Sequence, residues 1–161
     1  MLILGIDPGT SAIGYAAVKS DGRSQTLISA DLLHVTSVAP EERLRDIHQE
    51  IMLLIKKWKP EAISVEKLFF AKNTKTAMAV SESRGVILLT SVLAGIKVFE
   101  YTPLEVKKVV TGDGKADKAQ IKKMVQLTLP ETRALQARDD VFDAIAIALA
   151  CCFKEKMRGI A

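Results

Sequence analysis

LILGIDPG, residues 2–9, is the stretch that decides the fold class of this chain. From Leu2 to Ile6 it is apolar apart from one glycine, which is typical of a strand buried in a sheet, and Pro8-Gly9 marks a turn that ends the strand. A carboxylate at the end of a buried strand is costly unless something pairs with it. The stretch therefore predicts a buried strand that carries Asp7 at its carboxyl end.

The rest of the chain alternates between strand and helix signals. Further strands are predicted at residues 13–18, 25–35, 62–66 and 96–101, the second of them with imperfect alternation. Helices are predicted at 40–57, 73–94, 103–110, 117–129 and 139–156, with an interruption or close packing near Gly85 and a loop at 130–137. Three opening strands indicate an antiparallel meander, and later strands between helices indicate parallel additions. The expected fold class is α/β, a mixed five-stranded sheet flanked by helices.

Length and composition set wider limits. A chain of 161 residues that is 48% hydrophobic is long enough to bury a core, and we expect a single domain over residues 1–161. The net charge of +4 suits a polyanionic partner but is shared by many proteins without one. Cys151 and Cys152, in an apolar run, are expected to be small core residues. The sequence has no CxxC motif and no Cys/His cluster, which argues against a structural zinc site. Without a signal-peptide pattern or a membrane-length apolar run, we expect a cytoplasmic protein and no membrane partner.

Acidic residues stand at the ends of two predicted strands. Asp7 ends the first strand, and Glu66 ends the apolar strand 62–66. Ligand sites of α/β sheets lie at strand ends, so both carboxylates are candidates for one cleft. Each acid taken alone is better explained as the point where its strand leaves the core for solvent.

A third acidic segment opens the last helix, Asp139-Asp140-Val141-Phe142-Asp143. Asp140 and Asp143 are three residues apart and share one helix face, where their charges repel each other unless a cation lies between them. Helix capping would explain Asp139 or Asp140, but it explains Asp143 less well. Carboxylate ligands without nearby His or Cys suit Mg²⁺ or Mn²⁺, and such sets support two-metal phosphodiester hydrolysis. The residues thus indicate a metal-dependent nuclease or phosphotransferase.

Four segments of the chain form a recognisable set: GIDPGTSAIGYA at 5–16, AISVEKLFFAKN at 62–73, ESRGV at 82–86 and DDVFDAIAIA at 139–148. In this order they resemble one known family, the RuvC Holliday junction resolvases. The resemblance implies an RNase H-like fold, a homodimer, and two Mg²⁺ ions per site with Mn²⁺ as a substitute. It implies symmetric nicking of two strands of four-way junction DNA in recombination and repair. Branch-migration proteins of the RuvA and RuvB type are the implied partners.

The resemblance also implies roles for particular residues. The catalytic and metal-binding acids would be Asp7, Glu66, Asp140 and Asp143. Asp139 lies four residues before Asp143 and could face the same site. Whether it shares in metal binding is left open by the sequence.

Three further positions are expected to bind DNA. Phe69, with Phe70 beside it, matches an aromatic residue that stacks on or wedges a base, although core or dimer packing is the alternative. Lys107 and Lys118 match basic residues near the scissile phosphate, and more lysines extend the basic stretch: Lys108, Lys115, Lys122 and Lys123. The expected dimer surface is the apolar face of the helix around 77–92.

Three other functions share parts of this sequence pattern. GIDPGTSAIG at 5–14 also resembles the phosphate loop of actin-like and sugar-kinase ATPases, but those proteins need two such domains. A catalytically inactive DNA-binding module would have lost acids from one of the three segments. Another RNase H-like nuclease, acting on RNA or flaps, would keep all of them, and only its substrate would tell it apart.

Overall fold

A five-stranded sheet organises the chain in the computed structural model, which describes residues 1–9, 12–67 and 74–157. The strand order is β3-β2-β1-β4-β5. The strands are β1 Leu2–Asp7, β2 Gly14–Ser20, β3 Gln25–Leu32, β4 Ala62–Glu66 and β5 Lys97–Tyr101. β1, β2 and β3 pair antiparallel, whereas β4 joins β1 and β5 joins β4 in parallel. The predicted meander with parallel additions is therefore confirmed.

A bulge explains the imperfect alternation of the third strand. Ala17 of β2 pairs with Ser29, but the next residue, Val18, pairs with Leu27, so Ile28 has no partner across the ladder. An extra residue shifts every following side chain to the opposite face. β3 also ends at Leu32, so the prediction that the strand runs to residue 35 was too long.

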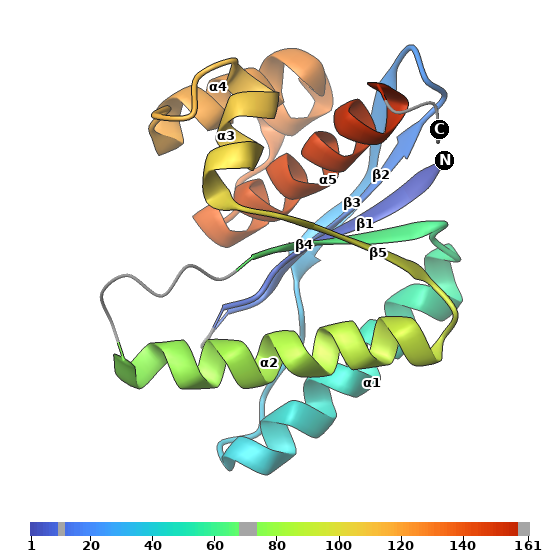
Figure 1. The fold of residues 1–161 in the computed structure, drawn as a ribbon, viewed down its shortest axis with the longest axis vertical. Helices are drawn as coiled ribbons and strands as arrows, with labels where there is room; N and C mark the ends of the chain where they lie inside the picture. Colours follow the sequence, from blue (N-terminus) through green and yellow to red (C-terminus); the bar gives the residue numbers. More distant parts are fainter. Residues whose placement is uncertain (10–11, 68–73, 158–161) are drawn as a thin grey trace.

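Helices cover both faces of the sheet (Figure 1). They are α1 Pro40–Trp58, α2 Thr74–Leu93, α3 Pro103–Thr111, α4 Lys118–Thr128 and α5 Asp139–Met157. α1 and α2 lie on one side, while α5 crosses the other side with α3 and α4 beside it. Within the described residues, none of these helices combines the length and the apolar character needed to cross a membrane.

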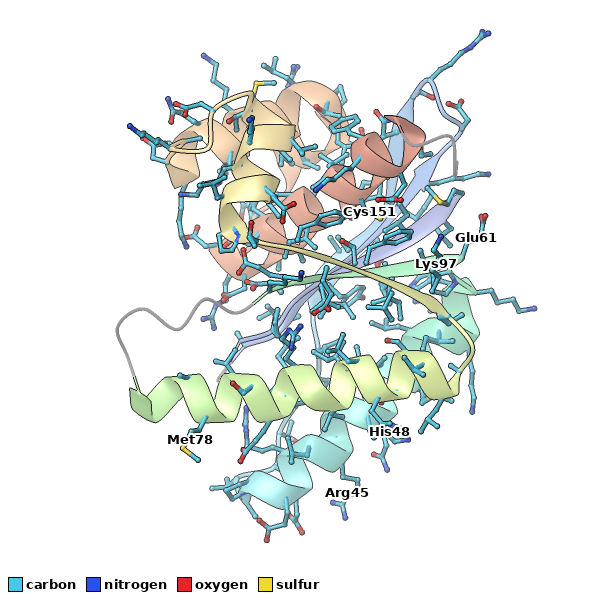
Figure 2. The ribbon with its side chains drawn as sticks, in the orientation of Figure 1. Arg45, His48, Glu61, Met78, Lys97 and Cys151 are labelled. Carbon is cyan, nitrogen blue, oxygen red and sulfur yellow. The ribbon has the colours of Figure 1, made fainter. Side chains whose placement is uncertain are left out.

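Two apolar cores follow from the period-two alternation of the strands. Ile3, Ala16 and Val18 face the α5 layer, and their neighbours Leu4 and Ala17 face the α1 and α2 layer. Cys151 and Cys152 are buried in the α5 core, as the sequence predicted; Figure 2 shows Cys151 between α5 and the sheet.

Two local predictions were wrong. α2 continues unbroken through Gly85, because that position faces outward and a Cβ there would meet nothing within 4 Å. Residues 130–137 are not all loop, since Pro130–Ala134 form a 3₁₀ helix held by the bond from Thr132 N–H to the Leu129 carbonyl. Pro130 suits the start of this short helix because proline lacks a backbone N–H, and the first N–H of a helix has no partner within the helix.

Candidate active site

Asp7 and Glu66 are the last residues of two adjacent parallel strands, β1 and β4, and therefore lie at the same edge of the sheet. Ile6 of β1 is in register with Val65 of β4, so the acid that follows each of them falls at the same level. Asp7 shares a strand face with Gly5, and Gly5 lies against α5. Both acids therefore open onto the α5 side of the sheet.

Glycine at two strand positions lets α5 approach the sheet backbone to backbone. A Cβ on Gly14 would lie 2.0 Å from the Asp140 carbonyl oxygen, and one on Gly5 would lie 2.4 Å from the Ala144 oxygen. Gly14 is the residue that pairs with Asp7 across the ladder. The contact thus places the first turn of α5 directly beside Asp7.

A side-chain hydrogen bond adds to this docking farther along α5. The buried Ser64 hydroxyl of β4 donates to the Ile147 carbonyl at 3.1 Å. Its neighbour on the strand face is Glu66, two residues on. β1, β2 and β4 therefore each contribute one small residue that fixes α5 above the two strand-end acids.

The carboxylates of this site raise one another's proton affinity. Burial first, and then the charges of Glu66, Asp143 and Asp140, raise the pKa of Asp7 to about 7. Burial and then Asp143 raise the pKa of Glu66 to about 7, against the opposing effect of Lys107. Burial also raises the pKa of Asp143. The four acids that the sequence singled out therefore interact across three separate segments.

Two cations pair with the α5 acids at the rim. Lys118, the first residue of α4, places its Nζ 3.6 Å from an Asp143 oxygen and 3.2 Å from an Asp139 oxygen. The hydrogen bond to Asp139, followed by the charge of Asp143, raises the pKa of Lys118. Arg138 Nε lies 3.3 Å from an Asp140 oxygen. Positive side chains thus stand at the rim, beside the carboxylates of α5.

Helix α3 places Lys107 beside Glu66, Lys118 and Asp143. Thr102 and Glu105 form a capping box at the start of α3. Glu105 also accepts a hydrogen bond from Lys154 Nζ of α5 at 2.6 Å. These contacts hold the pKa of Glu105 at about 2, with the bond to Lys154 as the largest cause. The clamp fixes α3, and with it Lys107, relative to α5.

A cavity of about 150 Å³ lies between these elements. Its polar wall combines two acids of the site, Glu66 and Asp143, with the ammonium groups of Lys107 and Lys118. The remaining wall is apolar and comes from α3, α4 and α5: Pro103, Val106, Ile121, Ala146 and Ile147. Opposite charges on one small cavity suit a ligand that is both anionic and metal-binding.

The donor set fits a divalent cation by its chemistry. Four carboxylates with no nitrogen or sulfur ligand are typical of Mg²⁺ or Mn²⁺ sites. A cation would offset both the burial and the repulsion between carboxylates, which together raise the pKa values of Asp7 and Glu66. In the described part of the chain, no three His, Cys, Asp or Glu side chains already stand close enough to hold a metal ion. Asp140 and Asp143 instead point to Arg138 and Lys118.

The structure brings most of the predicted site residues together, but not all. The four acids, Lys107 and Lys118 gather around one strand edge and its cavity. Phe69 and Phe70 lie outside the described residues. Sequence reasoning missed Gly5, Gly14, Ser64 and Arg138. A small residue two positions before each strand-end acid was the available signal for Gly5 and Ser64. Gly14 and Arg138 had no such signal.

A mixed sheet of this order, with strand-end acids facing the last helix, is the architecture of RNase H-like nucleases. The family model for crossover junction endodeoxyribonuclease RuvC matches residues 3–151, and this chain belongs to that family. A relative from Pelotomaculum thermopropionicum is 44% identical over 152 residues, covering 92% of this chain and 91% of its own. One from Moorella thermoacetica is 46% identical over 150 residues, covering 92% and 89%. Both carry the name of the same endonuclease.

Solved structures agree with the fold. The Thermus thermophilus RuvC structure superimposes with a TM-score of 0.88 at 30% identity, covering 98% of this chain and 97% of its own. The same protein in complex with a Holliday junction substrate gives 0.88 at 31% identity, covering 100% and 98%. The yeast mitochondrial resolvase Ydc2 shares the fold alone, with a TM-score of 0.72 at 13% identity.

Proposed function

We propose that this chain is a Mg²⁺-dependent endonuclease that cuts four-way DNA junctions by nicking two symmetric strands as a homodimer. Its role would lie in homologous recombination and repair, in the cytoplasm, beside branch-migration proteins of the RuvA and RuvB type. The observation that carries the proposal is the likeness, at 31% identity over the whole chain, to a RuvC bound to a Holliday junction. The acid set at the sheet edge supports the chemistry.

The four acids would hold two divalent ions. Asp7 and Glu66 approach from the sheet, and Asp140 and Asp143 approach from α5. When bound, such ions supply a nucleophile at neutral pH and offset charge on the leaving oxygen. The carboxylates would fix the positions of the two ions. The packing of α5 on the glycines of β1 and β2 holds the α5 acids beside those of the sheet.

The surrounding cations would bind and position the scissile phosphate. Lys107 and Lys118 both line the cavity and would offer ammonium groups to non-bridging oxygens. Phe69, which follows the Glu66 strand in sequence, would stack on a base that is unpaired at the crossover and so favour branched DNA.

The exposed side of α2 would form the homodimer contact. Apolar side chains recur there at helical spacing and face solvent: Met78, Leu89, Val92 and Leu93. Figure 2 shows Met78 pointing away from the sheet. Gly85 lies within this stripe and leaves open space where two helices would cross closely. Exposed apolar patches of this kind mark interaction surfaces.

The decisive experiment is cutting of a synthetic mobile four-way junction with and without Mg²⁺. Linear duplex and a flap substrate of the same sequence serve as controls. Paired nicks in opposite strands of the junction, dependent on the metal and much faster than cutting of either control, are expected. Equal cutting of duplex or flap would instead indicate a nuclease without junction selectivity, and binding without cutting would indicate a DNA-binding module.

A further inference from the structure

Lys118 occupies a position that its own helix does not favour. It is the first residue of α4, and Asp117 before it caps the helix through the capping box with Gln120. The amino-terminal end of a helix carries partial positive charge, so a cation there needs compensation from outside. The compensation comes from the first turn of α5, where acids are favoured for the same reason. Two helix starts therefore meet across one ammonium group.

Asp139 and Asp143 share that ammonium group unequally. The Lys118 Nζ is 3.2 Å from Asp139 Oδ2, within hydrogen-bond range, and 3.6 Å from Asp143 Oδ2. Asp143 is the more buried partner, with 34% of its side chain exposed against 69% for Asp139. Asp139 thus lies at the outer rim, while Asp143 faces the acid set. The same three residues line a small adjoining pocket with Lys122 and Phe142.

We infer that Asp139 is a positioning residue for Lys118 and not a metal ligand. This inference rests on the proposed function, in which Asp143 binds a divalent ion and Lys118 contacts the scissile phosphate. A carboxylate that shares its electrons with a metal ion attracts an ammonium less strongly. Asp139 stands outside the acid set and keeps its full charge for Lys118, so the ammonium stays at the cavity wall.

Without Asp139, the flexible lysine has no fixed partner of its own. A lysine side chain has four rotatable bonds and a strongly hydrated head, so it either pairs with Asp143 alone or turns out to solvent. Pairing with Asp143 alone draws the ammonium group away from the phosphate, and turning outward loses the phosphate contact altogether. Both changes slow the chemical step, although neither removes a ligand from the metal.

The test compares Asp139→Asn with Asp139→Glu, and uses Glu42→Gln on α1 as a control of equal charge change far from the site. Single-turnover junction cutting in Mg²⁺ is expected to fall about fivefold in Asp139→Asn, the factor that corresponds to one exposed ion pair. Asp139→Glu restores most of the rate because the longer carboxylate still reaches Lys118. Junction affinity in Ca²⁺ stays the same or tightens, because a negative charge near the DNA has been removed.

Two readouts separate positioning from metal binding. The melting temperature is measured against Mg²⁺ concentration, where Asp139→Asn responds like the parent protein and Asp143→Asn does not. The acylation rate of Lys118 by an amine-reactive ester is read by mass spectrometry, with the exposed Lys123 as reference within the same chain. Loss of the Asp139 partner raises the Lys118 rate about fivefold relative to Lys123.

Each outcome decides a separate point. An Mg²⁺ response lost in Asp139→Asn as in Asp143→Asn makes Asp139 a metal ligand and overturns the inference. Unchanged cutting, or unchanged acylation of Lys118, also overturns it. A parent protein that leaves the junction intact overturns the proposed function instead, and the acylation rates still decide whether Asp139 holds Lys118.

Discussion

At the scale of single residues, the ionised carboxylates of Asp7 and Glu66 lower the stability of the folded protein at neutral pH. Burial withdraws both carboxylates from water and raises the pKa of each. Nearby negative charges add to this effect, from Glu66, Asp143 and Asp140 at Asp7 and from Asp143 at Glu66. A solvent-facing acid at a strand end would show neither effect. The placement therefore favours a site that binds cations over the simpler explanation that both strands merely leave the core there.

The first prediction concerns stability against pH. The pKa of Asp7 is about 7 in the folded protein and 3.8 in the unfolded chain, so between these values the folded state binds more protons. Stability contributed by this group therefore falls as pH rises from about 4 to 7 and stays low above that. Asp7→Asn should raise the melting temperature at pH 8, without divalent ions, by at least about 2–4 °C.

The comparison that checks this prediction is the same variant at pH 5, where much of the penalty is absent and the gain should shrink. Glu42→Gln supplies the control for loss of one negative charge on the surface. Added Mg²⁺ should stabilise the parent protein more at pH 8 than at pH 5 and should stabilise Asp7→Asn little at either. Equal gains at both pH values would contradict the raised pKa.

The second prediction concerns the effect of the α5 acids on cutting as opposed to binding of the junction. Asp143→Asn should abolish junction cutting, by a factor of about 100 or more, because a ligand at the reacting centre is lost. Junction binding measured in Ca²⁺ should remain, since removing negative charge does not weaken contact with a polyanion. Asp140→Asn should behave alike. Cutting by Asp143→Asn at the parental rate would show that the acid set was wrongly assigned.

At the scale of elements, the site depends on how closely α5 sits on the sheet. Gly5 and Gly14 bring helix backbone to within contact of strand backbone, and Ser64 adds a buried hydrogen bond. A helix start at this distance places Asp140 and Asp143 within electrostatic reach of Asp7. The acids are therefore assembled by the packing of small residues that carry no chemistry themselves.

The third prediction tests that packing. Gly14→Ala should destabilise the protein by about 1–3 kcal/mol and reduce cutting strongly, because the new methyl group meets the Asp140 carbonyl, a backbone atom that cannot turn aside. Gly114→Ala is the matched control, since a methyl group there comes closest to the exposed Leu104 side chain, at 3.2 Å, and the nearest backbone atom is at an ordinary contact distance of 3.7 Å. Denaturant unfolding and single-turnover cutting measure the two effects. Full activity in a stable Gly14→Ala protein would contradict the role of this contact.

At the scale of the whole molecule, the two layers of helices have different tasks. The α3, α4 and α5 layer carries the cavity and its cations, while the α1 and α2 layer presents an apolar outer stripe on α2. The sheet separates the two layers (Figure 1). A dimer formed through α2 would leave both cavities open to DNA, which is what paired nicking of one junction requires.

The fourth prediction follows from that arrangement. Leu89→Glu would bury an unpaired charge in an α2 contact, so the Kd of the dimer should rise about thirtyfold or more. Light scattering should then show a monomer, and junction cutting should lose its paired nicks. Leu127→Glu changes an equally exposed leucine on α4, across the sheet, and should leave the dimer intact. A Leu89→Glu protein that stays dimeric would place the interface elsewhere.

Much of this protein was determined by its sequence alone. The buried strand before Asp7, the helix periodicities and the turn residues predict the element order and the mixed sheet, because local periodicity and turn chemistry act over a few residues. The acids at element ends, and the resemblance of four segments to one family, indicated the site residues before any contact was known. The errors were local: Gly85 does not break α2, and β3 ends early.

Only the tertiary structure decided how those residues meet. No local pattern shows that Gly14 lies under the Asp140 carbonyl, or that Lys118 pairs with Asp139 and Asp143, since these partners are far apart along the chain. The raised pKa values of Asp7 and Glu66 likewise depend on burial by other elements. Distance and desolvation are properties of the packed chain, whereas periodicity and residue type are already present in its sequence.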